Sequence, residues 1–280
     1  MKQILLPTDF SENAYNAMSY ALQLYKDVKC KFYILHTYTP IVTSRGSNVD
    51  TSSRLVLKDV VKEIAERKLK KIQDELNKKF NNVNHTFITA LSYNLLIPEM
   101  KSVIKEKDID LIIMGSKGTT SAKETFIGKN TMYAIKKLQS PVIAIPSRFK
   151  YEKPRGVVLP ADYKFSKSNK CLLLIKELCE AHDFRSHILN DYNHTLEEKQ
   201  KQLANFLDVF FKDNPHLSKT GERLDLIDTI DAFEAKQKVN FLIMIHNKHN
   251  FFENLLFKPV VNQIVYDTNV PFMVIPSEAS

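Results

Sequence analysis

The sequence contains no tryptophan, only three cysteines and only six glycines among its 280 residues. The cysteines, Cys30, Cys171 and Cys179, are odd in number and form no C-x-x-C pair. Neither a framework of disulfides nor a cysteine-based zinc site is therefore expected. This cysteine usage favours a reducing compartment, and we expect a cytoplasmic protein.

Long hydrophobic runs are also missing. No apolar segment approaches the ~18 residues that a membrane-spanning helix requires. The first residues do not show the basic stretch and apolar segment of a signal peptide. A composition of 44% apolar and 26% charged residues is ordinary for a soluble globular protein. We therefore expect no membrane partner, and the length suits one large or two small domains.

The charge is positive, with 40 Lys and Arg against 32 Asp and Glu and a net charge of +8. Nucleic-acid binding is one interpretation of such a charge. However, the lysines of segment 67–71 lie among acidic residues, a mixture that is typical of solvated helix faces. The sequence shows no RNP motif and no basic groove interleaved with aromatic residues. We therefore expect no nucleic-acid partner, although the charge would help to attract nucleotide anions.

Three of the six glycines, Gly115, Gly118 and Gly128, lie in one short stretch. The apolar run 110–114 before them predicts a buried strand, and the segment 131–138 after them predicts an amphipathic helix. Backbone N–H groups at the start of a helix suit an anion such as phosphate, and glycine allows a ligand to approach closely. The same glycines also suit a plain turn. The apolar face of the helix is predicted to contain Met132, Ile135 and Leu138.

The glycine stretch matches neither a Walker A loop nor the Rossmann G-x-G-x-x-G pattern. Its spacing, Gly115-x-x-Gly118, nine residues and then Gly128, resembles the G-2x-G-9x-G-[ST] signature of ATP-binding universal stress proteins. The segment 4–11, with its Pro7-Thr8-Asp9 turn, is similar to the first strand of that family, and 141–146 is similar to its last strand. The resemblance covers the first half of the chain well and the second half loosely. One departure is Lys129, which stands where the family has Ser or Thr.

The resemblance implies a Rossmann-like, adenine nucleotide alpha hydrolase-like α/β fold that binds ATP, ADP or AMP, with Mg²⁺ left open. The Pro7-Thr8-Asp9 turn and Thr37 would hold the adenine and ribose, while Gly115 and Gly118 would admit the ribose and phosphates. The phosphates would meet the start of the following helix. The cofactor-binding residues implied in this way are Pro7, Thr8, Asp9, Thr37, Met114, Gly115, Gly118, Gly128, Lys129, Asn130 and Thr131.

Several of these residues have an alternative role that the sequence leaves open. Asp9 suits the cap of the following helix equally well, as does Ser11. Met114 also suits the core, and Thr131 an ordinary first helical turn. Lys129 would either pair with a terminal phosphate as a point charge or point into solvent.

Strand and helix patterns alternate over the first 147 residues, which predicts a parallel sheet with helices on both faces. Predicted strands cover 3–6, 31–37, 86–91, 110–114 and 141–145, and helices cover about 11–27, 55–80, 97–106 and 131–138. The polar connection 38–53 is predicted to be mobile. The buried stripe of the first helix is predicted to contain Ala14, Ala17, Met18, Ala21, Leu22 and Tyr25.

The pattern then repeats after a short charged linker, 148–154. Segment 157–162 resembles 5–9, and 186–189 resembles 32–35. Later, 240–245 resembles 110–114, and 271–277 resembles 141–147. We therefore predict a tandem duplication, with domains at 1–147 and 155–280. The family resemblance implies that the final strands of the two copies, 141–146 and 271–276, pair within one chain, while pairing between chains stays open.

The second copy is predicted to have lost its phosphate site. His246, His249 and Pro259 stand where the first copy has its three glycines. Proline supplies no N–H donor, and histidine side chains would crowd a phosphate. His246-x-x-His249 is not expected to bind a metal, because metal sites need about three or four ligands. Asp162 has the place of Asp9 but no phosphate loop beside it.

These features together predict a cytoplasmic stress-response protein that binds an adenine nucleotide in its first domain and acts as a sensor or regulator. No nucleophile–base pair or carboxylate pair is recognisable, so a binding protein is favoured over an enzyme. Three alternatives stay open. They are an interaction scaffold in which Lys129 has abolished nucleotide binding, a slow ATP hydrolase, and a binder of another small molecule between the two copies.

Overall fold

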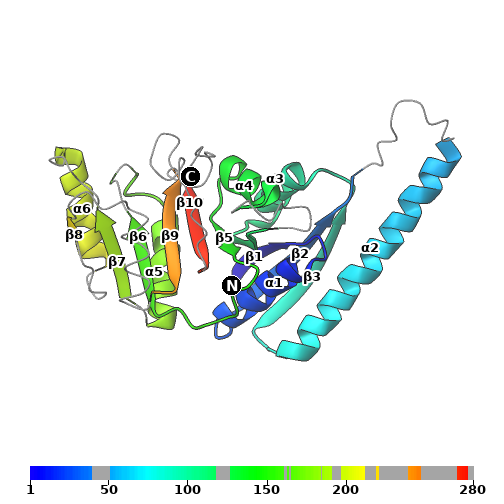
Figure 1. Ribbon diagram of the computed structural model, residues 1–280, viewed down its shortest axis with the longest axis horizontal. Helices are drawn as coiled ribbons and strands as arrows, with labels where there is room; N and C mark the ends of the chain where they lie inside the picture. Colours follow the sequence, from blue (N-terminus) through cyan, green and yellow to red (C-terminus); the bar gives the residue numbers. More distant parts are fainter. Residues whose placement is uncertain are drawn as a thin grey trace.

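The computed structural model of the chain contains one continuous sheet with helices on both faces (Figure 1). The structure describes residues 1–39, 51–117, 127–160, 163, 165–183, 185–190, 197–211, 219–220, 239–246 and 270–276. Among these residues the sheet has ten strands in the order β3-β2-β1-β4-β5-β10-β9-β6-β7-β8. Pairing is parallel throughout except between β5 and β10, so the sheet is mixed.

The first half of the sheet is built by residues 2–145. Its elements are β1 (Lys2–Pro7), α1 (Glu12–Leu24), β2 (Cys30–Thr37), α2 (Thr51–Phe80), β3 (His85–Ser92), α3 (Leu96–Lys107), β4 (Leu111–Gly115), α4 (Lys129–Lys137) and β5 (Val142–Ile145). The elements of the second half are β6 (Gly156–Pro160), α5 (Cys171–His182), β7 (Arg185–Asn190), α6 (Glu198–Phe210), β8 (Lys219–Thr220), β9 (Phe241–His246) and β10 (Phe272–Pro276).

The strands and helices expected from the sequence are present, with boundaries that differ by a few residues. The largest difference is α2, which begins at Thr51, four residues before its predicted start, and runs for 30 residues. Its amino-terminal half extends beyond the edge of the sheet (Figure 1). Most of the predicted mobile connection, 40–50, lies outside the described residues.

Helix α1 shows how the local sequence sets an element and its orientation. Ser11 caps the helix, because its side chain accepts a hydrogen bond from the backbone N–H of Ala14, which settles the choice between Asp9 and Ser11 in favour of Ser11. The predicted apolar stripe is confirmed, since all six of its members are buried.

In α4 the predicted face is partly wrong. Ile135 and Leu138 are buried and Met132 is only half-buried, because Thr131 and Ala134 complete that face.

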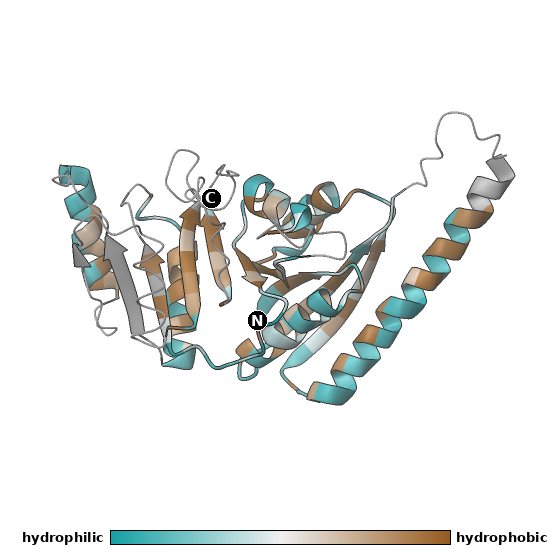
Figure 2. Cartoon of the chain, viewed as in Figure 1, coloured by the Kyte–Doolittle hydropathy of each residue, from teal (hydrophilic) through white to brown (hydrophobic). Residues whose placement is uncertain are grey.

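The sheet separates two layers of apolar side chains. One layer packs beneath α1, α2, α5 and α6 and runs across both halves of the sheet. The other packs beneath α3 and α4 and also reaches β9 and β10. The strands near the centre are apolar over most of their length, whereas α2 alternates between polar and apolar bands (Figure 2). Strands that are buried on both faces are expected to lack an alternating pattern, and these strands follow that rule.

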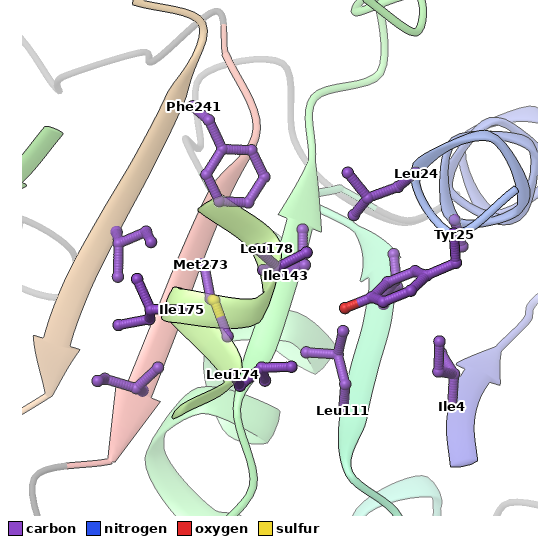
Figure 3. Close-up of a cluster of buried hydrophobic side chains, with 14 of the residues drawn as sticks. Ile4, Leu24, Tyr25, Leu111, Ile143, Leu174, Ile175, Leu178, Phe241 and Met273 are labelled. Carbon is purple, nitrogen blue, oxygen red and sulfur yellow. The ribbon is translucent and has the colours of Figure 1, made fainter. Parts of the chain in front are cut away.

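The two halves meet where β5 pairs antiparallel with β10, with Ile143 opposite Met273. The sequence predicts this pairing of the two final strands. Side chains of α5 pack beside this junction, and Figure 3 shows Ile175 and Leu178 near Met273 and Ile143. Leu24 at the end of α1 and Tyr25, which follows it, belong to the same buried cluster. One buried cluster therefore continues across the junction of the two halves.

Candidate functional site

A pocket opens at the carboxyl ends of β1 and β4, which are neighbours in the sheet. The chain runs from β1 to β2 on one side and from β4 to β5 on the other, so the strand order reverses here. Ligands of open α/β sheets bind at such switch points. Ten of the eleven residues predicted from the sequence line this pocket, and Gly118 lies outside the described residues. The ten are Pro7, Thr8, Asp9, Thr37, Met114, Gly115, Gly128, Lys129, Asn130 and Thr131.

The turn between β1 and α1 forms one wall. Its backbone is fixed by side chains, since Thr8 Oγ1 accepts the N–H of Phe10 at 3.0 Å and Asp9 Oδ1 accepts the N–H of Ser11 at 3.0 Å. Phe10 has a φ of 64°, in the left-handed region that a bulky residue rarely adopts. Such strain occurs where the surrounding structure imposes it, often beside a functional site.

His36 also lines the pocket, although it is not among the residues predicted from the sequence. Its Nδ1 lies 2.7 Å from the backbone carbonyl of Thr8. A carbonyl only accepts, so Nδ1 carries the hydrogen and Nε2 is left as an acceptor in the neutral ring. The centroids of the His36 and Phe10 rings lie 4.2 Å apart. Burial lowers the pKa of His36, and the hydrogen bond to Thr8 opposes this shift.

Gly115 ends β4 in a crowded place. A Cβ atom added there would lie 3.2 Å from the backbone oxygens of both Asn13 and Lys117. The side chain of Asn13 in turn donates from Nδ2 to the Lys117 carbonyl at 3.3 Å. Glycine therefore suits the close packing of α1 against the loop after β4, independently of any ligand.

The amino terminus of α4 faces the pocket. Gly128 is its N-cap, and no side chain caps the first turn among the described residues. The N–H of Gly128 itself donates to the Ser116 carbonyl at 2.7 Å, and the hydroxyl of Thr131 donates to the Gly115 carbonyl at 2.8 Å. These two groups therefore hold the loop together. The N–H groups of the first turn, with Lys117 and Lys129 beside them, suit an anion.

Five further lining residues are missing from the sequence prediction, namely Ser11, Ala14, His36, Leu96 and Lys117. Thr37, which was predicted, directly follows His36 at the end of β2, so the sequence indicated where His36 lies. It did not indicate that the His36 ring contacts Phe10. The second-copy positions His249, Pro259 and Asp162 lie outside the described residues, as does the side chain of His246.

No group of three or more His, Cys, Asp or Glu side chains among the described residues is arranged to hold a metal ion. No helix in the described part of the chain is long and apolar enough to cross a membrane.

The fold is that of an α/β protein, and it has a pocket at the strand switch point. A family model described as the universal stress protein family matches residues 1–146, which is more than half of the 280 residues. The chain therefore belongs to the universal stress protein family. Its Rossmann-like fold, as the resemblance implied, is confirmed.

Known relatives agree with this assignment. Universal stress protein MJ0577 of Methanocaldococcus jannaschii is 28% identical over 157 residues, which cover 51% of this chain and 94% of that protein. Universal stress protein MJ0531 of the same organism is 24% identical over 146 residues. A crystal structure of a universal stress protein from Archaeoglobus fulgidus matches with a TM-score of 0.67 at 16% identity, covering 98% of this chain and 96% of that one. That likeness shows the fold alone, and it extends through the second half.

Proposed function

We propose that the pocket at the ends of β1 and β4 binds ATP or a related adenine nucleotide. The observation that carries this proposal is the meeting of the β1–α1 turn, the end of β2 and the start of α4 in one pocket. The resemblance to the glycine signature of ATP-binding universal stress proteins supports it. The protein would then act as a nucleotide-dependent sensor or regulator in the cytoplasm.

The electrostatics of the pocket suit the phosphate end of such a ligand. Lys117 and Lys129 line it, and Asp9 is the one acidic side chain among the described lining residues. Lys129 is the first residue of α4 and is exposed, so its ammonium is free to approach a phosphate as a point charge. The described lining residues include no pair of carboxylates, and we therefore favour nucleotide binding over hydrolysis.

The second half would serve as a degenerate partner of the first. Its strand order, β8-β7-β6-β9-β10, repeats β3-β2-β1-β4-β5, which supports a duplicated domain with a boundary in 148–154. The substitutions at the second glycine positions favour loss of nucleotide binding there. One nucleotide per chain is the resulting expectation.

Isothermal titration of ATP with Mg²⁺ tests the proposal, after the purified chain has been checked for bound nucleotide. Wild type should bind one ATP per chain. Lys129→Gln should weaken binding about fivefold, corresponding to about 1 kcal/mol, and Lys137→Gln at the other end of α4 should not. Absence of both heat and co-purified nucleotide would overturn the proposal and favour an interaction scaffold.

A further inference from the structure

A groove separate from the nucleotide pocket lies between α1 and α2, on the face of the sheet that these helices cover (Figure 1). Its volume is about 920 Å³, within the range of small-molecule sites. None of its lining residues also lines the pocket at the ends of β1 and β4. We propose that this groove binds a small organic anion that carries an aromatic or other planar apolar body.

The charge of the groove selects an anion. Lys68, Lys71 and Lys79 line it from α2, and Lys150 lines it from the segment that follows β5. Two carboxylates, Glu12 and Glu75, also line it, so four cations face two anions. Glu75 is engaged by Lys71 at 3.8 Å. The excess of positive charge in a recess between two helices favours a negatively charged ligand.

Aromatic rings lie directly beside these cations. The Lys68 ammonium sits 5.2 Å from the centre of the Phe10 ring, and the Lys79 ammonium sits 5.4 Å from the centre of the Tyr15 ring. Tyr151 lines the groove from the same segment as Lys150. The planar body of a ligand would contact one of these rings, while its charged group would contact a lysine ammonium. We therefore assign the ligand both a planar apolar body and a negative charge.

The wall of the groove also holds a hydroxyl without a partner. Ser19 of α1 lines the groove and is only 8% exposed. Its Oγ is buried and makes no hydrogen bond among the described residues. A buried polar atom without a partner destabilises the free protein. Because Ser19 lines the groove, we assign its hydroxyl the role of a donor to the ligand.

The probe for the test is 8-anilinonaphthalene-1-sulfonate, an aromatic anion whose fluorescence rises on binding. Titration into the full-length wild-type chain should saturate, and Lys68→Gln/Lys79→Gln should bind about tenfold more weakly. The matched control, Lys62→Gln/Lys70→Gln, removes the same charge from α2 outside the groove and should bind like wild type. Circular dichroism establishes that each variant is folded.

Equal weakening in both double variants would show that only net charge matters and would overturn the proposal, as would unchanged binding in Lys68→Gln/Lys79→Gln. Displacement of the probe by ATP would also overturn it, because the probe would then occupy the nucleotide pocket.

Ser19→Ala gives an independent measurement. Its thermal midpoint should equal or exceed that of wild type, while its affinity for the probe should fall about fivefold. Wild-type affinity in Ser19→Ala would contradict the assigned role of the hydroxyl.

Discussion

The hydroxyl of Thr131 donates a hydrogen bond to the backbone carbonyl of Gly115 over 2.8 Å. This bond ties the first turn of α4 to the last residue of β4, and Thr131 is almost fully buried where it forms. Gly115 and the start of α4 are more than ten residues apart in the sequence. The hydrogen bond from Thr131 holds them together in the folded protein.

Thr131→Val keeps the shape of the side chain and removes the donor. We expect it to lower the free energy of unfolding by about 1 kcal/mol, because the part-buried Gly115 carbonyl loses the hydroxyl that donates to it. Thr131→Ser retains the hydroxyl and should lie closer to wild type. Urea denaturation measures both values, and equal stability of the two variants would contradict a role for this bond.

Gly115→Ala should be destabilising although no ligand is present. The added Cβ would lie 3.2 Å from two backbone oxygens, those of Asn13 and Lys117, and backbone cannot move aside as a flexible side chain does. We expect a loss of about 1–3 kcal/mol, typical of overpacking. Thermal unfolding of the variant checks this expectation, and a midpoint equal to that of wild type would show that α1 moves away easily.

Met273→Ala should be costly because it opens a cavity at the junction of the two halves. Met273 is fully buried opposite Ile143, and truncation of such a side chain costs about 2–5 kcal/mol. Leu173→Ala is the matched control, since Leu173 is 58% exposed and should change stability by about 0.5 kcal/mol or less. Similar losses in both variants would mean that the junction contributes little to stability.

The three thiols should react slowly in the native protein. Burial raises the pKa of Cys171 to about 11 and that of Cys30 and Cys179 to about 12. The thiolate is the reactive form, so about 0.1% or less of each thiol is reactive at pH 8. Ellman's reagent should therefore label the native chain much more slowly than the chain in guanidinium chloride, where all three thiols are exposed. Equal rates would contradict the buried positions.

Stability should fall as the pH drops below about 6.5, the ordinary pKa of histidine. Burial lowers the pKa of His36, His85 and His182 in the folded protein. The unfolded chain therefore binds more protons between that value and the folded pKa values. The stability that the three neutral histidines contribute is fully present above pH 6.5. It is lost as the pH falls toward their pKa values in the folded protein.

His85 offers a specific test of this pH dependence. Its Nε2 bonds to the Tyr25 carbonyl at 3.0 Å, and its Nδ1 is buried without a partner among the described residues. Protonation of Nδ1 would place a positive charge on a half-buried ring, at an atom that has no acceptor among the described residues. His85→Gln should therefore flatten the decline in unfolding free energy between pH 7.5 and 5, measured by urea denaturation. An unchanged slope would assign the effect to other groups.

The positions of the elements were predictable because they depend on local chemistry. The stripe of α1 from Ala14 to Tyr25 follows from helical periodicity, and the strands are short apolar runs between turn residues. The pairing of β5 with β10 was predicted from family resemblance and repetition, since composition alone does not specify a partner strand. The start of α2 was missed because the residues 51–54 are polar and carry no apolar period.

The candidate site likewise has one part that the sequence predicts and another part that depends on the tertiary structure. The sequence alone determined where glycine, lysine and the Pro7-Thr8-Asp9 turn lie relative to strand ends, because strand and helix signals are local. Only the tertiary structure decided which groups are already engaged there, such as the Gly128 N–H with Ser116 and the Thr131 hydroxyl with Gly115. It also decided that His36 contacts Phe10 and that one core runs beneath both halves. Hydrogen bonds and packing between residues distant in the chain depend on the closed fold, and no short window of sequence contains them.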